Sequence, residues 1–414
     1  MPFKNFVISA VDSFANRGVE ALVQATLAGI FRQREDASAV VLSNAHAYNA
    51  ARIDDARVRC ETDWFQTGRV RMHMKSGPPA RLVTKRFAPR LRNLDATLAD
   101  ADVFVLSGGD LLSSDYGSPA SWLSQVHYAA SKGLPVVLLS HSIGPFKNDD
   151  HRRSFMDAIP SISLVTARER RSFDYLTQDL GMSAEKVRHT ADVAFLLERA
   201  PRAWAEKVVR HLGLSTDRAI VGLSVSGGIA KYVGSNSERH MDQLVGLVDA
   251  VRQKLEAQVL VVPHAANPQN ADSDLFVATK LIERLGYPED VAVAALDLSA
   301  SQYKGLLASC DFVVAERMHA AIGALSSEVP TCVISYSVKA PGIVADVVGE
   351  DWLDRLVVPL DHFLANDGVD KVLAAWPARG DIVSILKGRL SSIREASQRN
   401  FDALFELEAA GGVG

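Results

Sequence analysis

Short apolar segments alternate with helical segments along almost the whole chain of 414 residues, and this alternation limits the fold more than any other feature. Runs such as Phe6 to Ala10, Val103 to Ser107 and Phe312 to Ala315 are typical of buried strands, and a segment with helical spacing follows each. Parallel strands need a long crossover connection, usually a helix. The alternation therefore predicts an α/β protein with parallel sheets that helices cover on both faces.

The strand–helix pattern restarts near residue 219, which favours two sheets over one. A polar connection that contains proline precedes it around Ala200. We therefore expect an N-terminal domain over residues 1–200 and a C-terminal domain over 201–375. The last segment, 376–414, has apolar residues at helical spacing and is predicted to be a helix that packs back across the structure.

The composition is that of a globular protein, with 48% hydrophobic residues, 23% charged residues and a net charge of −4. This charge gives no bulk attraction to nucleic acid, so no nucleic-acid partner is expected. Three cysteines without a CxxC pair or a Cys/His cluster favour a reducing compartment and predict no metal site. No long apolar stretch indicates a signal peptide or a membrane span, so we expect a cytoplasmic protein.

The segment from Arg69 to Asn93 is strongly basic and also contains apolar residues. One interpretation is a solvated loop that leads into a helix. The other is a surface that contacts anionic lipid or a lipid-linked diphosphate substrate. Peripheral contact with the inner face of a membrane is therefore left open.

The stretch DFVVAERMHAAIGALSSEVP, Asp311 to Pro330, is the most informative for function. A buried strand ends at Ala315 and a helix rich in small residues begins near His319, so Glu316 and Arg317 lie at the junction. Ligands bind at such strand ends, and a helix start attracts anions. Arg317 and His319 together predict an anionic ligand that the first binds and the second protonates.

Two further strand ends carry glycine. In the first, Asn16, Arg17 and Gly18 form a polar turn and Glu20 begins a helix, so the segment is either a capped turn or a backbone cradle for a ligand. In the second, Gly108 and Gly109 directly follow a strand, where paired glycines allow a ligand or another backbone to come close.

Three polar side chains of the first half stand next to apolar runs. His141 lies at the end of the strand expected in PVVLLSHSIGPF and is either a candidate acid or base or a histidine satisfied in its turn. Arg168 belongs to a cationic cluster at a helix start, which is locally unfavourable and hence a candidate anion contact. Asp192 could orient a hydroxyl or a histidine, or cap a turn.

In the second half, VGLSVSGGIAKYVG repeats the arrangement of a strand followed by glycine, and Ser226 is a candidate contact to a phosphate. His264 follows another strand and is either a ligand contact or a turn histidine.

These segments together resemble the polysaccharide pyruvyl transferase family. The resemblance spans roughly residues 5 to 345 and rests on six motifs, with a tail, ISYSVKAPGI, that includes Tyr336 and Lys339. The motifs are Asn16–Gly18–Glu20, SGGD at 107–110, SHSIGPF at 140–146, ARERRS at 167–172, ADVAFLL at 191–197 and ERMHAAIGAL…VP at 316–330.

The resemblance implies a GT-B-like fold of two Rossmann-like domains facing across a cleft, with the acceptor on the N-terminal side. It implies transfer of the pyruvyl group of phosphoenolpyruvate onto two hydroxyls of a saccharide or lipid-linked saccharide, in cell-surface or exopolysaccharide biosynthesis, without a cofactor. His319 would then be the general acid, and His141 the base, with Asp192 or Glu316 in reserve. Lys339 would stabilise the departing phosphate. Tyr336 joins the substrate-binding residues through this motif alone.

Two other functions fit the same pattern less well. A GT-B glycosyltransferase that uses a nucleotide sugar would share the fold, and an arginine near a helix start could hold its diphosphate. A binding protein without activity is disfavoured, because Arg317 and His319 are both present.

Overall fold

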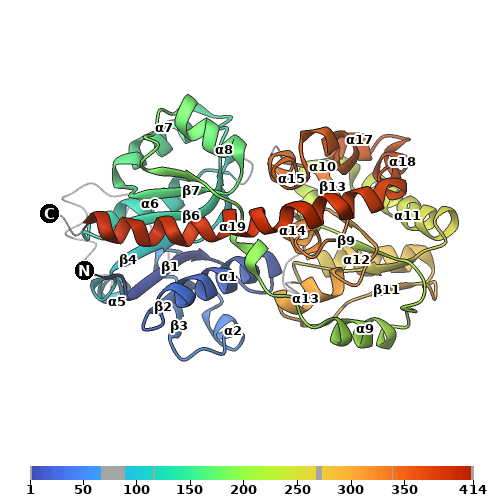
Figure 1. Cartoon of the computed structure of the whole chain (residues 1–414), viewed down its shortest axis with the longest axis horizontal. Helices are drawn as coiled ribbons and strands as arrows, with labels where there is room; N and C mark the ends of the chain where they lie inside the picture. The colour runs from blue at the N-terminus through green and yellow to red at the C-terminus, as the bar shows by residue number, and fades with distance from the viewer. Residues whose placement is uncertain (1, 67–88, 115–116, 267–272, 338, 412–414) are drawn as a thin grey trace. The chain divides into compact units, whose positions relative to one another are not determined.

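The computed structural model describes residues 2–66, 89–114, 117–266, 273–337 and 339–411. They belong to two compact units, which Figure 1 shows with their elements labelled. Unit 1 consists of Met1–Phe14, Leu22–Leu196 and Glu395–Gly414, and unit 2 consists of Ala15–Ala21 and Leu197–Arg394.

Unit 1 is built on a parallel sheet with the strand order β3-β2-β1-β4-β6-β7-β8, and β5 pairs with β6. Its strands are β1 (Asn5–Val11), β2 (Ser38–Ser43), β3 (Val58–Thr62), β4 (Val103–Leu106), β5 (Gly109–Leu112), β6 (Val136–Ile143), β7 (Leu164–Ala167) and β8 (Val187–His189). Its helices are α1 (Arg17–Gln33, of which the first turn belongs to unit 2), α2 (His46–Ala50), α5 (Pro89–Ala99), α6 (Ala120–Ala130), α7 (Asp149–Ala158), α8 (Arg170–Asp174) and the end of α19 (Arg379–Gly411).

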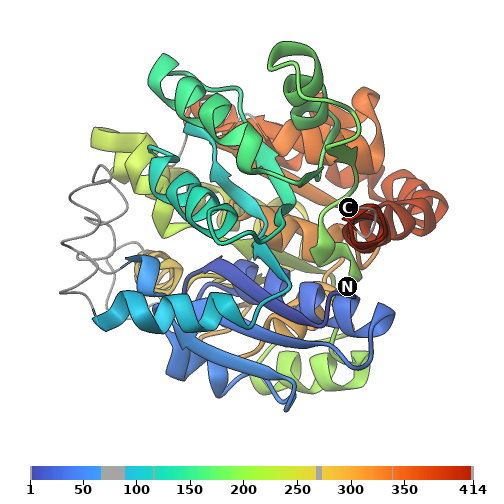
Figure 2. The same cartoon turned by 90° about the vertical axis from the view of Figure 1, so that its left-hand side faces the viewer.

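Helices cover both faces of this sheet because its strands are apolar on both faces (Figure 2). On β1, Val7 joins the core cluster with Leu94 of α5 and Val126 of α6. The neighbouring Phe6 points to the opposite face and packs edge-on against Phe405 of α19.

Unit 2 is a second parallel sheet with the order β11-β10-β9-β12-β13-β14. Its strands are β9 (Ile220–Ser224), β10 (Gln258–Val261), β11 (Val291–Val293), β12 (Phe312–Ala315), β13 (Thr331–Ser335) and β14 (Val357–Pro359). Its helices are α9 (Arg202–His211), α10 (Ala230–Val233), α11 (Ser237–Lys254), α12 (Asp274–Leu285), α13 (Ala300–Leu307), α14 (Met318–Leu325), α15 (Ala340–Val348), α16 (Leu353–Leu356), α17 (Leu360–Phe363), α18 (Gly368–Leu373) and the first part of α19.

The strand order of unit 2 is that of the Rossmann fold, in which the first strand lies between the second and the fourth. The first strand here is β9, which pairs with β10 on one side and with β12 on the other. Chain connections leave in opposite directions from this point, and ligands of such sheets bind beyond the carboxyl ends of the strands there. The fold therefore directs attention to the residues that follow β9, β10 and β12.

The predicted α/β class with two parallel sheets is confirmed, and β12 has the predicted bounds of Phe312–Ala315. The units differ from the expected segments 1–200, 201–375 and 376–414 in two ways. The short segment Ala15–Ala21 belongs to unit 2, and the chain returns to unit 1 at Glu395, inside the continuous helix α19. A boundary inside a helix leaves no mark in composition, which is why the sequence did not indicate it.

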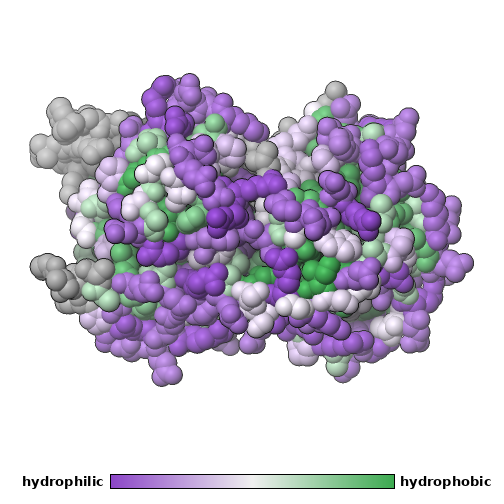
Figure 3. Space-filling model, turned by 45° about the horizontal axis from the view of Figure 1, so that its top comes forward, coloured by the Kyte–Doolittle hydropathy of each residue, from purple (hydrophilic) through white to green (hydrophobic). Residues whose placement is uncertain are grey.

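Residues 67–88, most of the basic segment, lie outside the described residues, so its two interpretations stay open. Among the helices that the structure describes, none is both long and apolar enough to cross a membrane. The face shown in Figure 3 is mostly hydrophilic, with small, separated hydrophobic areas.

Candidate functional site

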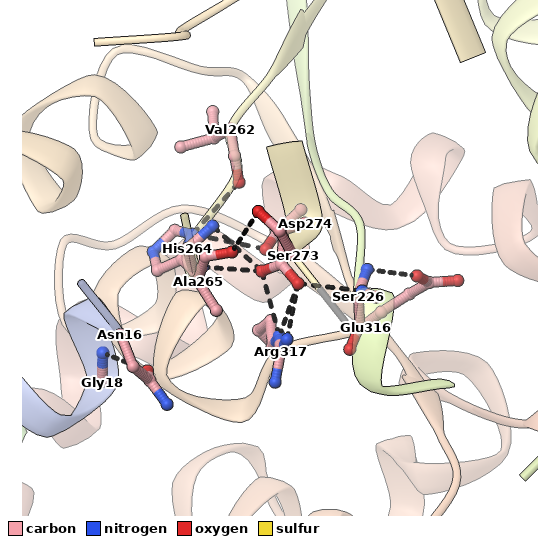
Figure 4. A network of polar contacts seen from close by, with 12 residues as sticks. Asn16, Gly18, Ser226, Val262, His264, Ala265, Ser273, Asp274, Glu316 and Arg317 are labelled. Carbon is pink, nitrogen blue, oxygen red and sulfur yellow. Dashed lines mark hydrogen bonds and ion pairs between the residues drawn. The ribbon is translucent and has the colours of Figure 1, made fainter. Parts of the chain in front are cut away.

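A polar network lies at the carboxyl ends of β9, β10 and β12 in unit 2 (Figure 4). Its centre is the pair of Arg317 and Asp274. Arg317 is the N-cap residue of α14, directly after β12, and Asp274 is the first residue of α12. The site therefore stands at the strand ends where the fold predicts a ligand.

Arg317 is oriented by a two-pronged contact with Asp274. Its Nε donates to Asp274 Oδ2 at 3.0 Å, and its Nη2 donates to Asp274 Oδ1. The Arg317 side chain keeps 20% of its surface exposed, whereas that of Asp274 is fully buried. A buried carboxylate thus orients the guanidinium, and part of the Arg317 side chain remains exposed.

Asp274 also ties together two of the loops that surround the site. Its carboxylate accepts hydrogen bonds from the backbone N–H of Gly227 at 2.8 Å and from that of Ala265 at 2.8 Å. Burial raises the pKa of this carboxyl group, and Arg317 and the two backbone donors oppose that shift by stabilising the charged form.

His319 lies in the first turn of α14 and packs against the start of α1. A Cβ built on Gly18 would lie 2.5 Å from His319 Nδ1, so only glycine allows this approach. Asn16 Oδ1 accepts the N–H of Gly18 at 3.0 Å, which makes Asn16 the helix cap that one interpretation of the sequence expected. Gly18 thus makes room for His319, and whether it also contacts a substrate stays a prediction.

His264 follows β10 and is neutral at physiological pH. Burial is the largest cause and lowers its pKa to about 3, the hydrogen bond between Nδ1 and the carbonyl of Val262 opposes this shift, and the positive charges of Arg317, His319 and Arg17 each add a smaller lowering effect. A neutral imidazole cannot balance the charge of an anion. Its predicted contact with substrate would have to be an uncharged hydrogen bond.

Glu316 is held by two protein donors. Its Oε1 lies 2.6 Å from Nε2 of His240, a buried residue of α11, and its Oε2 accepts the backbone N–H of Ser226 at 2.7 Å. Burial alone would lower the pKa of His240, but the charge and hydrogen bond of Glu316 outweigh it and raise that pKa. This geometry favours an anchoring role for Glu316, while its predicted role as a reserve base stays untested.

The two residues predicted from the tail motif lie beyond β13. Tyr336 is half-buried, and its ring packs against that of Tyr232, with 4.7 Å between ring centroids. Lys339 is 5% exposed and precedes α15. Their contacts with substrate stay predictions.

In unit 1, Arg168 and Asp192 pair with each other in the interior. Arg168 Nη1 lies 2.7 Å from Asp192 Oδ2, the two side chains are 1% and 0% exposed, and Arg168 Nε donates to Ser142 Oγ. Burial lowers the pKa of Arg168, and the negative charges of Asp192 and Asp110 more than offset it, so the net shift is upward. The anion that Arg168 contacts in the structure is therefore Asp192, and its contact with a substrate stays a prediction.

His141, at the end of β6, is fully buried, and its Nε2 lies 3.1 Å from the carbonyl oxygen of Leu106. A carbonyl can only accept, so Nε2 carries the proton of this hydrogen bond. Nearby, a Cβ on Gly108 would lie 2.5 Å from the carbonyl oxygen of Ser140, and Gly109 has a φ of +113°. These two glycines therefore allow close backbone packing and a turn, and the base role of His141 stays a prediction.

Sequence reasoning missed three residues of the network, Asp274, His240 and Arg17. Asp274 reads as an ordinary acidic residue at a helix start, and His240 lies inside a helix with no motif around it. Arg17 stood in the polar turn that the sequence singled out. It is 2% exposed and pairs with Glu20 at 3.2 Å and with Asp297 at 2.6 Å. Its neighbour Glu20, three residues on in a helix, was the available signal.

Comparison with known proteins identifies a family. The model of the family described as polysaccharide pyruvyl transferase matches residues 16–338. The chain is 21% identical over 257 residues to the amylovoran biosynthesis protein AmsJ of Erwinia amylovora. That match spans 61% of this chain and 61% of AmsJ, less than two thirds of the relative's length.

Solved structures with a similar fold include HepE of Anabaena in complex with UDP, with a TM-score of 0.56 and 16% identity over 99% of both chains. Another is UDP-GlcNAc 2-epimerase of Neisseria meningitidis bound to UDP-GlcNAc, with a TM-score of 0.60 and 12% identity over 97% of this chain and 100% of that one. At these identities the likeness shows the fold alone. These neighbours are of the GT-B type, which confirms the predicted GT-B-like fold class.

Proposed function

Because this chain belongs to the polysaccharide pyruvyl transferase family, we propose that it transfers the pyruvyl group of phosphoenolpyruvate onto two hydroxyls of a saccharide. The product is a cyclic ketal, and the other product is inorganic phosphate. The observation that carries the proposal is the placement of Arg317 and His319 at the start of α14, with Arg317 fixed by Asp274 and partly exposed.

Phosphoenolpyruvate carries a carboxylate and a phosphate, and the proposed reaction begins with protonation of its C3 carbon. Protonation of the C3 methylene makes C2 electrophilic, and the first hydroxyl adds there and releases its proton. The bond between C2 and the phosphate oxygen then breaks, and the second hydroxyl adds to C2 and releases its proton. One released proton replaces the one given to C3, and the other leaves with the phosphate.

His319 is the proposed acid because it lies two residues from Arg317 and within the first turn of a helix. Once it has given its proton to C3, the neutral imidazole can take the proton of the first hydroxyl. One residue then serves both steps, which matters because His141 is fully buried and Asp192 and Glu316 are hydrogen-bonded to protein groups. Arg317 is the proposed contact for the donor's negative charge.

The acceptor is proposed to be a saccharide or a lipid-linked saccharide of a cell-surface or extracellular polysaccharide. The relative AmsJ is named for the biosynthesis of such a polymer, amylovoran. The strand ends of unit 1 are the predicted acceptor side.

The first experiment is thermal unfolding with phosphoenolpyruvate, and with UDP-sugars and GDP-sugars in parallel. A ligand that binds only the folded state raises the melting temperature, and at 100 times its dissociation constant it stabilises by about 2.7 kcal/mol. We expect a shift with phosphoenolpyruvate that disappears in Arg317→Ala. A screen of diols and saccharides for phosphate release then identifies the acceptor class.

A nucleotide-sugar transferase is the alternative that this experiment tests, since similar folds are known in complex with UDP or UDP-GlcNAc. A shift with a nucleotide sugar and none with phosphoenolpyruvate would replace the proposed donor. Retained stabilisation by phosphoenolpyruvate in Arg317→Ala would leave the donor in place and remove Arg317 from its site.

A further inference from the structure

Gly228, in the turn after β9, borders a small space whose nearest neighbours are all polar. A Cβ built on this residue would lie 3.5 Å from Ser226 Oγ, 3.6 Å from Arg317 Nη1 and 3.8 Å from Arg317 Nη2. These are ordinary contact distances, so a methyl group would fit there. The φ of Gly228 is not in the left-handed region, so the backbone itself does not require glycine.

The hydroxyl of Ser226 lies next to this space. It has no hydrogen-bond partner in the part of the chain that the structure describes. Its residue is 1% exposed, and its Oγ makes no hydrogen bond there. Buried hydroxyls are nearly always hydrogen-bonded, so an unsatisfied one at a strand end calls for an explanation. A ligand oxygen between Ser226 and Arg317 supplies it.

Arg317 turns a particular edge toward the same space. The edge formed by Nε and Nη2 donates to Asp274. What faces Gly228 is the end of the guanidinium, because a Cβ built on Gly228 would lie 3.6 Å from Nη1 and 3.8 Å from Nη2. In Figure 4 Arg317 lies next to Asp274, and Ser226 and Glu316 lie to one side of that pair.

From this geometry we infer that Ser226, Gly228 and Arg317 form a subsite for the phosphoryl group of the donor. Two separate donors, a hydroxyl and the end of a guanidinium, can each bind a different oxygen of a tetrahedral phosphoryl group. Gly228 leaves room for one of those oxygens. This inference rests on the proposed function for the identity of the donor, but the binding of a phosphoryl oxygen here does not depend on turnover.

Asp274 is the positioning residue of this subsite. It holds Arg317 by one edge and the backbone of Gly227 by a 2.8 Å hydrogen bond, so the guanidinium and the turn that carries Gly228 share one anchor. Its exposed fraction is zero, so it does not contact the ligand itself.

The test is the binding of inorganic phosphate, pyruvate and phosphoenolpyruvate to the full chain and to Gly228→Ala and Ser226→Ala, by calorimetry or thermal shift. The added methyl of Gly228→Ala fills the space without strain, and Ser226→Ala removes the hydroxyl. We expect both variants to bind phosphate and phosphoenolpyruvate about tenfold more weakly or worse, the loss typical of a hydrogen bond to a charged group. Pyruvate binding should stay within about twofold.

Gly246→Ala, on α11, is the matched control, because among the described residues a Cβ there would meet Val369 of α18 at an ordinary contact distance of 3.7 Å and no atom of Ser226 or Arg317 within 4 Å. It should bind all three probes like the unchanged chain. An equal loss of pyruvate binding in Gly228→Ala would make the subsite one for a carboxylate, and unchanged phosphate binding in both variants would remove it. A third outcome separates the two proposals. If the unchanged chain binds phosphate but not phosphoenolpyruvate, and Gly228→Ala loses the phosphate binding, the subsite stands and the proposed donor is wrong.

Discussion

The two units are both parallel sheets covered by helices, but the arginine–aspartate pairs at their strand ends differ in how far the arginine is buried. In unit 1, Arg168 and Asp192 are 1% and 0% exposed and neutralise each other. In unit 2, Arg317 is paired with the buried Asp274 and still keeps 20% of its side chain exposed. An arginine that a buried carboxylate already orients can bind a ligand without first being ordered, which lowers the entropic cost of binding.

The histidines of the two units differ in the same way. His141 is fully buried and donates from Nε2 to a backbone carbonyl, whereas His319 is partly exposed in the first turn of α14. The comparison indicates that a motif residue at a strand end is not by itself a site. At the strand ends of unit 1 both members of the charged pair are buried, whereas Arg317 and His319 of unit 2 are partly exposed.

The largest expected effect separates these two histidines. His319→Gln should lower the turnover number by about 10²–10⁴-fold, the range for a general acid, with little change in melting temperature. His141→Leu should leave turnover within a fewfold and destabilise the fold by about 1–3 kcal/mol, because the carbonyl of Leu106 loses its donor in the interior. Steady-state kinetics and urea unfolding on both variants give the two readouts.

The opposite pattern would be informative. If His141→Leu lost turnover and kept its stability, the base role predicted for His141 would be restored and unit 1 would carry part of the chemistry. Near-normal turnover in His319→Gln would remove the proposed acid.

The second prediction concerns the two arginine–aspartate pairs. Asp192→Ala leaves Arg168 charged and buried and should destabilise the protein by about 3–5 kcal/mol. Asp274→Ala should destabilise it less, since Arg317 can turn toward water, but should raise the KM for phosphoenolpyruvate more. Asp192→Ala with Arg168→Met is the matched control, because it removes both charges and should recover much of the stability. If both single variants lost the same stability and kept the same KM, the two pairs would not differ in their roles.

The sequence predicts the architecture well and the site only in part. Apolar runs such as Phe312 to Ala315 identify the central strands, because a strand buried on both faces is apolar throughout. The edge strand β3, with the sequence VRCET and no fully buried residue, has no such signal. Local motifs indicate Arg317 and His319, but Asp274 belongs to the start of another helix, α12. Its contact with Arg317 spans 43 residues and depends on the packing of the whole unit.

The third prediction tests whether the start of α1 positions His319. Gly18→Ala places a methyl 2.5 Å from His319 Nδ1, so the imidazole must shift, and turnover should fall by roughly tenfold to a hundredfold, as small misplacements of catalytic groups do. Affinity for phosphoenolpyruvate should change much less, because Arg317 is held independently by Asp274. Gly388→Ala, on α19 with no atom within 4 Å of the new Cβ, is the control and should not affect turnover. A loss of affinity equal to the loss of turnover would instead indicate that Gly18 contacts the substrate.

The smallest effect is the pH dependence of the buried pair of His240 and Glu316. The pKa of His240 is raised in the folded state above its usual value of about 6.5, because the effect of Glu316 exceeds that of burial. A raised pKa stabilises the fold fully below about pH 6.5, and this contribution is lost as the pH rises through the higher value of the folded state. Urea unfolding of the unchanged chain and of His240→Gln between pH 5.5 and pH 9, a range chosen to bracket the ordinary histidine pKa, measures it. The stability advantage of the unchanged chain should shrink toward alkaline pH. An advantage that grew with pH would mean that His240 is neutral in the fold and that Glu316 is anchored mainly by the backbone of Ser226.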